Sequence, residues 1–215
     1  MKVLLLHAFP LDERMWEPQR PALTEHEVVA PRLYGRGRTM DAWADSIARE
    51  LDGDVAVVGA SMGGYCALAF ARRVPERVRR MLLVGSRANA DSAERQAARA
   101  ETINLVRTEG PDALWQSMVP KLLGDPALAD DRLLFRDADA LVEALEAIRD
   151  RPDSTAIAHA LGDRLEFLAA EDDPYVSADD LREFDVRVMP GTRHLVNLER
   201  PDEFNSILRE FLARV

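Results

Sequence analysis

The chain of 215 residues is poor in features that would tie it to a membrane, to nucleic acid or to an oxidising compartment. Its single cysteine, Cys66, excludes an internal disulfide and favours a reducing environment. No run of 18 apolar residues could span a bilayer, and the apolar run at 3–6 is too short for a signal peptide. Lys and Arg number 28 against 38 Asp and Glu, a net charge of −10. No basic patch of the kind that nucleic acid requires is evident, and an acidic surface argues against anionic membranes. We therefore expect a cytoplasmic protein with no nucleic-acid or membrane partner.

The composition is that of one ordinary globular domain. Hydrophobic residues make up 47% and charged residues 31% of the chain, and 215 residues suffice for a single well-packed core. Arginines are spread among acids along the helical patterns, which predicts solvent-exposed faces with i,i+4 pairing. Residues 87–101 are rich in Ala, Arg and acids. Nothing in the composition decides between a monomer and a homodimer.

Short apolar runs separated by helical patterns predict an α/β fold with a doubly wound, mainly parallel sheet of about six strands and helices on both faces. The expected strands are 3–8, 28–30, 55–58, 80–85, 165–170 and 185–189. Asp41 is expected to cap the helix that precedes the third strand.

Residues 87–160 interrupt this alternation. They contain several amphipathic helical patterns and no clear strand, with a joint at Gly110-Pro111. About seventy residues is long for one crossover between strands. We interpret the segment as a helical cap inserted within a single domain, 1–215, over the carboxyl edge of the sheet.

The most informative stretch is residues 55–65, a β-branched run that ends in small residues around a serine. Gly59 and Gly63 flank Ser61 in the pattern G-x-S-x-G, and an alanine-rich helical pattern follows. The glycines leave room for a sharp turn that holds the serine in strained geometry, and the following helix directs free N–H groups toward it. The pattern predicts a nucleophile at the end of a central strand.

Other strand ends carry groups that could assist this serine. The strand at 165–170 is followed by the acids Asp172 and Asp173, and the last strand is followed by His194. A serine needs a base, and a histidine base needs a third group that fixes its tautomer. Ligands bind outside the carboxyl ends of such strands, so these residues should converge. His7, after the first strand, is expected to be structural.

The sequence resembles α/β-hydrolase-fold proteins over nearly its whole length. Within them it is most similar to small esterases and lactonases of the oxoadipate enol-lactonase type. The stretches that carry the resemblance are Leu6-His7-Ala8-Phe9-Pro10-Leu11-Asp12, Gly59-Ala60-Ser61-Met62-Gly63-Gly64, Ala170-Glu171-Asp172-Asp173-Pro174 and Pro190-Gly191-Thr192-Arg193-His194-Leu195.

The resemblance implies a catalytic triad and an oxyanion hole. Ser61 would be the nucleophile, His194 the general base and then acid, and Asp173 the orienting carboxylate, with Asp172 as its competitor. The backbone N–H groups of Phe9 and Met62 would hold the oxyanion.

We expect the substrate to meet residues beside the triad and on one face of the cap. The candidate contacts are Phe9, Leu11, Trp115, Met118 and Leu195.

The expected function is that of a serine hydrolase which cleaves small carboxylic esters or lactones through an acyl-enzyme on Ser61. No cofactor and no metal are expected: no metal-ligand spacing links the histidines, and Gly35-x-Gly37 lacks the third glycine of a dinucleotide fingerprint. The same triad could instead cleave carbon–carbon bonds or form peracids. A ligand-binding or signalling protein with little turnover could also retain the fold.

Overall fold

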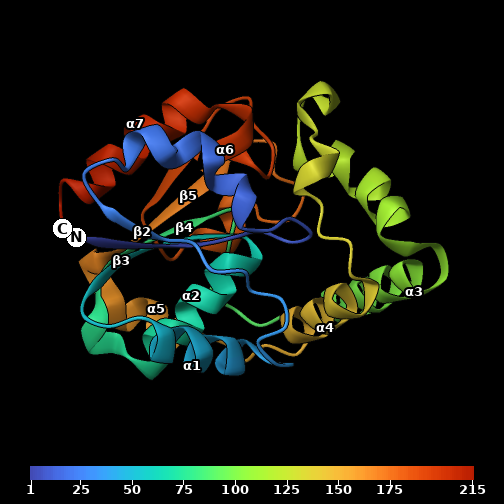
Figure 1. The fold of residues 1–215 in the computed structure, drawn as a ribbon, viewed down its shortest axis with the longest axis horizontal. Helices are drawn as coiled ribbons and strands as arrows, with labels where there is room; N and C mark the ends of the chain where they lie inside the picture. Colours follow the sequence, from blue (N-terminus) through green and yellow to red (C-terminus); the bar gives the residue numbers. More distant parts are fainter.

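The computed structural model describes residues 1–215, apart from the side chain of Ala178, and contains one six-stranded parallel sheet (Figure 1). The order of the strands across the sheet is β2-β1-β3-β4-β5-β6, and each neighbouring pair is parallel. The strands are β1 (Lys2–Leu6), β2 (Glu27–Val29), β3 (Val55–Ala60), β4 (Val78–Val84), β5 (Leu165–Ala170) and β6 (Val186–Met189). The predicted doubly wound α/β fold is confirmed.

The central strands are continuous apolar runs because both faces of the sheet are covered. Every residue of β3 is buried, and β3 pairs with β1 on one side and β4 on the other. The register places Gly59 between Leu6 and Leu83. The ends of β1, β3 and β4 therefore lie side by side at one edge of the sheet.

Helices cover the two faces (Figure 1). On one face lie α1 (Met40–Glu50), α2 (Met62–Arg73) and α5 (Thr155–Leu161), and on the other lie α6 (Val196–Glu199), α7 (Pro201–Leu212) and the 3₁₀ segment η1 (Glu13–Ala22). Shorter 3₁₀ turns are η2 (Pro75–Arg77), η3 (Pro126–Leu128), η4 (Asp131–Leu133), η5 (Gly162–Arg164) and η6 (Ala178–Leu181).

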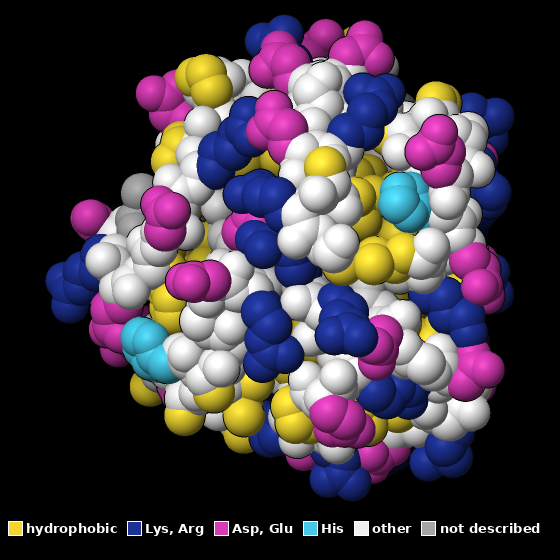
Figure 2. Space-filling model, turned by 90° about the vertical axis from the view of Figure 1, so that its left-hand side faces the viewer, with side chains coloured by type: hydrophobic (Ala, Val, Ile, Leu, Met, Phe, Trp, Pro, Cys, Tyr) yellow, Lys and Arg dark blue, Asp and Glu magenta, His cyan; other side chains and the backbone are white. Residues whose placement is uncertain are grey.

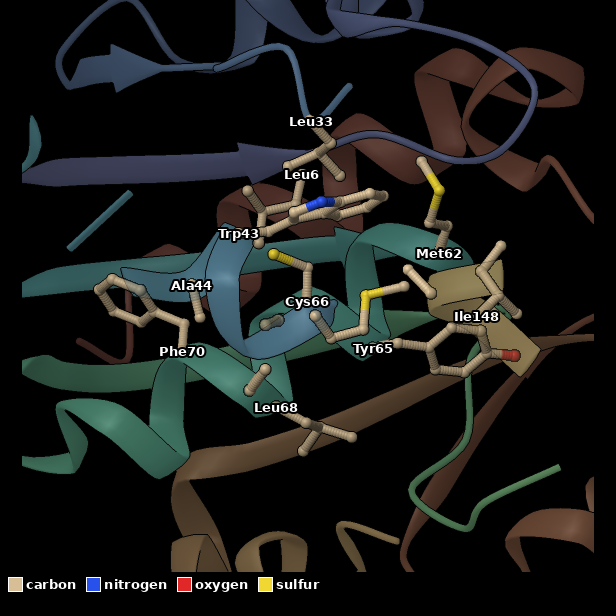
Figure 3. Packing of buried hydrophobic residues seen from close by; sticks show 14 of the residues in the cluster. Leu6, Leu33, Trp43, Ala44, Met62, Tyr65, Cys66, Leu68, Phe70 and Ile148 are labelled. Atoms are coloured by element: carbon tan, nitrogen blue, oxygen red, sulfur yellow. The ribbon is translucent and has the colours of Figure 1, made fainter. Parts of the chain in front are cut away.

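The helix α2 is the centre of the larger core cluster. Its residues 62–71 are all buried, so it is apolar on every side, as a fully enclosed helix must be. In Figure 3, Cys66 and Phe70 of α2 point toward Trp43 and Ala44 of α1. This packing fixes the start of α2, and with it the turn that precedes the helix.

Between β4 and β5 the chain forms α3 (Ala93–Leu122) and α4 (Ala138–Arg149), which pack together beyond the carboxyl edge of the sheet (Figure 1). Gly110 interrupts α3 with φ 84° and ψ 180°, at the joint that the sequence indicates. Ser154 N–H donates to the carbonyl oxygen of Ala88 at 2.9 Å, so the two ends of this segment meet. We call residues 89–153 the cap. α5, most of which lies in the range 87–160 expected for the cap, contacts α2.

One capping prediction is wrong. Thr39, not Asp41, caps α1: its hydroxyl accepts a hydrogen bond from Ala42 N–H at 3.1 Å, and Asp41 lies in the first turn. The carboxylate of Asp41 instead pairs with Arg72 on α2 at 2.6 Å. In the described part of the chain, no helix has the length and apolar character needed to cross a bilayer.

Candidate active site

Ser61 lies on the sharp turn between β3 and α2. Its φ of 49° and ψ of −112° make it the one non-glycine residue with positive φ among those the structure describes. Such a conformation is sparsely populated for an L-residue and persists only where the surroundings enforce it. Here Ser61 N–H donates to the carbonyl oxygen of Val84 at 2.8 Å, and Ser86 Oγ donates to the carbonyl oxygen of Ser61 at 3.1 Å.

The glycines around Ser61 allow a close approach of backbone segments. A Cβ on Gly59 would lie 2.6 Å from the carbonyl oxygen of Gly63, and a Cβ on Gly63 would overlap the carbonyl group of Leu6. Only glycine fits where strand and helix approach so closely. The beginning of α2 is thereby held against the carboxyl end of β1, next to the loop that contains Phe9.

A buried histidine–carboxylate pair lies at the neighbouring strand ends. His194 Nδ1 is 2.8 Å from Asp173 Oδ2 and 2.9 Å from Oδ1, and both side chains are almost fully buried. Asp173 Oδ1 also accepts from the backbone N–H groups of Tyr175 and Val176, at 2.8 and 3.2 Å. Asp172 is exposed and its backbone N–H donates to Thr192, so Asp173 is the acid that contacts His194.

The carboxyl end of β4 contacts both the turn at Ser61 and the ring of His194. Val84 accepts the hydrogen bond from Ser61 N–H, and the next residue, Gly85, lies against the imidazole of His194. A Cβ on Gly85 would be 3.2 Å from both Nδ1 and Cε1 of that ring. With Nδ1 facing Asp173, the Nε2 atom is the one available to a reacting group.

Two backbone N–H groups next to the turn have no acceptor among the described residues. They belong to Met62, the first residue of α2, and Phe9, in the loop after β1. Phe9 lies two residues beyond His7, whose carbonyl oxygen approaches Gly63. A helix N-terminus with free donors favours negative charge nearby, so this position suits an oxyanion.

A cavity of about 250 Å³ opens between α3 and the loop after β5. Phe9 and Met118, two of the five expected substrate contacts, line it, together with Tyr175. The Tyr175 ring meets the His194 ring edge-on, with centroids 4.8 Å apart. The cavity is therefore separated from the His194–Asp173 pair by a single layer of side chains.

The other three expected contacts, Leu11, Trp115 and Leu195, are buried and are not among the described residues that line the cavity. Leu11 forms a β-bridge with Leu134, and Leu195 is packed in the second core cluster. Trp115 donates from its indole Nε1 to Asp131 Oδ1 at 2.6 Å. Their packing inside the core leaves Phe9 and Met118 as the candidates with direct access to a ligand.

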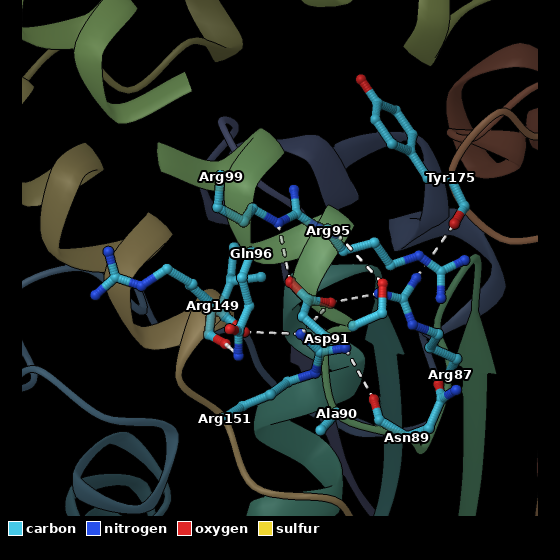
Figure 4. Close-up of polar contacts among 12 residues, drawn as sticks. Arg87, Asn89, Ala90, Asp91, Arg95, Gln96, Arg99, Arg149, Arg151 and Tyr175 are labelled. Carbon is cyan, nitrogen blue, oxygen red and sulfur yellow. Dashed lines mark hydrogen bonds and ion pairs between the residues drawn. The ribbon is translucent and has the colours of Figure 1, made fainter. Parts of the chain in front are cut away.

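A buried charge cluster around Asp91 departs from the general expectation that arginines and acids lie on solvent-exposed helical faces. Arg87 and Asp91 are almost fully buried and form an ion pair, and Asp91 also contacts Arg151 at 2.8 Å and Arg99 at 3.3 Å (Figure 4). Burial lowers the pKa of Arg87. Burial opposes ionisation of Asp91 as well, but Arg151 and Arg99 hold its pKa below the usual range. Arg87 and Asp91 precede α3, which begins at Ala93, so helical i,i+4 spacing does not describe how this cluster forms.

His7 makes the backbone contacts expected of a structural residue. Its Nε2 accepts from Leu33 N–H at 3.0 Å, which places the ring proton on Nδ1, 3.2 Å from the carbonyl oxygen of Ala8. Burial lowers the pKa of His7 to about 4, so it is neutral at pH 7. Burial raises the pKa of the Cys66 thiol to about 12. The described residues contain no group of three or more His, Cys, Asp or Glu side chains that could hold a metal ion.

Comparison with known proteins gives a consistent family match. A model described as the alpha/beta hydrolase family matches residues 3–207. The chain is 38% identical over 91 residues to a pimeloyl-[acyl-carrier protein] methyl ester esterase of Aromatoleum aromaticum, a match that covers 39% of this chain and only 36% of that protein. It is 28% identical to a 2-hydroxy-6-oxo-2,4-heptadienoate hydrolase of Pseudomonas putida, over 92% of this chain and 83% of that enzyme.

Solved structures agree with this match. A thermophilic esterase from Thermogutta terrifontis superimposes with a TM-score of 0.88 at 30% identity, and the alignment covers 100% of this chain and 90% of that one. The enol-lactonase from Burkholderia xenovorans superimposes with a TM-score of 0.85 at 23% identity, over 99% of this chain and 91% of that one. At that lower identity the likeness shows the shared fold alone.

Proposed function

Because the chain belongs to the alpha/beta hydrolase family, we propose that it is a serine hydrolase which cleaves small carboxylic esters or lactones through an acyl-enzyme on Ser61. One observation carries the proposal: the buried pair of His194 and Asp173 lies beside the strained turn that presents Ser61. Serine is a weak nucleophile alone and becomes effective when a base with a fixed tautomer takes its proton. The esterase names of two similar proteins support the ester class.

In the first step, Ser61 Oγ bonds to the carbonyl carbon while His194 Nε2 takes the hydroxyl proton. Asp173 accepts a hydrogen bond from Nδ1–H of His194, remains ionised and stabilises the imidazolium that forms. The carbonyl oxygen becomes an oxyanion, which accepts hydrogen bonds from the N–H groups of Phe9 and Met62. Loss of one such donor typically lowers kcat about 10²- to 10³-fold.

In the second step, the tetrahedral intermediate collapses and the bond to the alcohol oxygen breaks. His194 gives its proton to that oxygen, and the acyl group stays on Ser61. A water molecule then attacks the acyl-enzyme, with His194 as base, and releases the carboxylic acid. For a lactone the alcohol and the acid are parts of one product. We further propose that the cap supplies the wall that selects the acyl group.

A fluorophosphonate tests the nucleophile directly. The serine oxygen displaces fluoride from phosphorus, so peptide mass mapping should find the phosphonyl group on Ser61. The Ser61→Ala variant should form no adduct, and its kcat toward p-nitrophenyl butyrate should be about 10⁴- to 10⁶-fold lower. Ser206→Ala, on the exposed side of α7, is the matched control and should keep both. Labelling elsewhere, or unchanged turnover in Ser61→Ala, would refute the proposal.

A carbon–carbon bond hydrolase is the second candidate. It is favoured by the P. putida relative, which is named a 2-hydroxy-6-oxo-2,4-heptadienoate hydrolase and aligns with 92% of this chain. The same Ser61 and His194 would then act on a ketone carbonyl. Cleavage of a dienoate substrate is followed by the decay of its absorbance, and hydrolysis of the butyrate ester is measured at the same enzyme concentration. The substrate with the greater kcat/KM identifies which of the two reactions the protein catalyses.

A further inference from the structure

The turn that follows β4 contacts the surroundings of all three proposed triad residues, although it supplies none of them. Residues 84–86 hold the backbone of Ser61 and lie against the ring of His194. Arg87 is the next residue, and its side chain reaches the loop after β5, which carries Asp173. The side chain of Arg87 therefore completes a set of contacts from one turn to all three residues.

Arg87 binds the backbone of this loop close to Asp173. Its Nη1 donates to the carbonyl oxygen of Tyr175 at 3.2 Å (Figure 4). The N–H groups of Tyr175 and Val176 donate to Asp173 Oδ1 at 2.8 and 3.2 Å. Within the described residues, the bond from Arg87 is the only hydrogen bond that joins the backbone of residues 174–176 to another element. Arg87 therefore fixes where the two N–H groups that orient the Asp173 carboxylate lie.

The guanidinium of Arg87 is held in turn by Asp91. Its Nη2 forms an ion pair with Asp91 Oδ1, and both side chains are almost fully buried. Arg151 binds the same carboxylate oxygen at 2.8 Å, and Arg99 binds the other oxygen at 3.3 Å. A guanidinium is planar and rigid, so the ion pair with Asp91 also sets the direction of the donor that meets Tyr175.

Arg151 connects this charge cluster to the helix that follows Ser61. Its guanidinium carbon lies 3.9 Å from the centroid of the Tyr65 ring on α2. Its two Nη groups donate to the carbonyl oxygens of Asn89 and Ile148, at 2.9 and 2.7 Å. Stacking on an aromatic face and several hydrogen bonds together leave a guanidinium little freedom. The cluster therefore joins the loop after β5 to the helix that begins beside the nucleophile.

Stability alone does not account for the burial of these charges. On the face opposite the cap, Figure 2 shows acidic and basic side chains intermixed at the surface, where ion pairs stay solvated. Arg87 and Asp91 have lost their water, and a buried ion pair often stabilises a fold no more than apolar side chains of similar volume would. Arg87 Nε even lacks a hydrogen-bond partner among the described residues. What an arginine provides here, and an apolar side chain cannot, is a donor with a fixed direction toward Tyr175.

We infer that Arg87 is a positioning residue for the triad: held by Asp91, it fixes the loop after β5 so that the carboxylate of Asp173 meets His194 Nδ1. The inference rests on the proposed function of the same site. Arg87 acts through Asp173 and exchanges no proton with the substrate. A misplacement of about 1 Å can cost about 10²-fold in rate, so the position of this loop should determine kcat.

The test is a double-mutant cycle of Arg87→Met with Asp173→Asn, measured as kcat toward p-nitrophenyl butyrate. Arg87→Met should fold, because Asp91 keeps Arg99 and Arg151 as partners. It should lower kcat about 10- to 100-fold with little change in KM. In the Asp173→Asn background the same substitution should change kcat by less than about threefold, because the residue through which Arg87 acts is already disabled.

Arg80→Met is the matched control. Arg80 lies near the amino end of β4 and pairs with Glu166 of β5 at 2.7 Å, so it joins the same two strands away from the site. Glu166 keeps Arg214 as a partner, and kcat should stay within about twofold. Arg87→Lys keeps the charge without the planar fork and should retain more of kcat than Arg87→Met. It also supplies the cycle if the methionine variant does not fold.

Hydrogen exchange observes the loop without catalysis. In Arg87→Met the amide protons of Tyr175 and Val176 should exchange about 3- to 10-fold faster, the factor that corresponds to one hydrogen bond. The amide of Asp172 donates to the carbonyl oxygen of Thr192 at 3.0 Å and is the internal reference, whose exchange should not change.

The outcomes separate this role from the serine mechanism. Additive effects in the cycle, a rise in KM with kcat unchanged, or unchanged exchange at Tyr175 would each overturn the positioning role, and a fluorophosphonate adduct on Ser61 would still support the serine mechanism. Absence of that adduct would refute the serine mechanism. Faster exchange at Tyr175 in Arg87→Met would in that case still support Arg87 as the residue that holds the loop.

Discussion

Asp173→Asn gives the most direct test of how the histidine is held. The asparagine has the same shape, and its oxygen can still accept from Tyr175 and Val176 N–H, so the loop after β5 should keep its structure. Its amide nitrogen, however, would face His194 Nδ1, which now donates a hydrogen bond to the carboxylate at 2.8 Å. The imidazole would then carry its proton on Nε2 and could not accept one from Ser61.

The expected loss follows from that tautomer change. Exchange of the orienting aspartate for asparagine in a triad of this type lowers kcat about 10⁴-fold, which corresponds to about 5 kcal/mol of transition-state stabilisation. Steady-state hydrolysis of p-nitrophenyl butyrate measures the loss. The thermal unfolding midpoint, recorded in parallel, shows that the variant is folded.

Asp172→Asn is the control, because Asp172 is adjacent in sequence, exposed, and makes no side-chain hydrogen bond with the described residues. It should retain kcat within about twofold, as surface substitutions usually do. A folded Asp173→Asn variant that keeps more than a tenth of kcat would refute the assignment. So would a larger loss in Asp172→Asn.

Three further substitutions test the framework around the site. Gly63→Ala places a methyl group on the Leu6 carbonyl and should destabilise the fold by about 3 kcal/mol in urea unfolding, because neither backbone can yield. Gly35→Ala, where a Cβ meets nothing within 4 Å but φ is +78°, should cost only about 1 kcal/mol, and equal effects would contradict the close-approach argument. His7, with its pKa lowered from 6.5 to about 4, binds a proton more readily unfolded than folded, so stability should fall by about 3 kcal/mol between pH 6.5 and 4. His7→Gln keeps an acceptor for Leu33 N–H and should remove that part of the pH dependence, and a pH profile identical to that of the unchanged protein would exclude His7 as its source.

The fold and the turn at Ser61 were predictable because they depend on local patterns. Continuous apolar runs rich in β-branched residues are typical of strands that are covered on both faces. Gly59 and Gly63 lack a Cβ, which allows two backbone segments to approach closely at the turn. Thr39 and Asp41 show the limit: both residue types cap helices, and the choice between them depends on where the chain enters α1.

The buried charge cluster around Asp91 was not predictable from sequence. Arg87 and Asp91 precede α3, which begins at Ala93, and Arg99 lies on that helix. Arg151 reaches the same carboxylate from the far end of the cap, where Ser154 N–H bonds to the carbonyl oxygen of Ala88. The cluster therefore depends on two distant parts of the chain meeting, and spacing along the sequence does not predict that contact.

The hydrogen bond that joins Ser154 to Ala88 also has an evolutionary consequence. Residues 89–153 are an inserted segment whose two ends lie next to each other, and none of the six strands of the sheet lies within it. Loop-closure entropy changes slowly with length, so segments of other lengths can be inserted between the same two residues at little energetic penalty. Recombination at this junction would exchange the cap as a unit while β3, β5 and the loops that carry Ser61 and Asp173 are inherited unchanged.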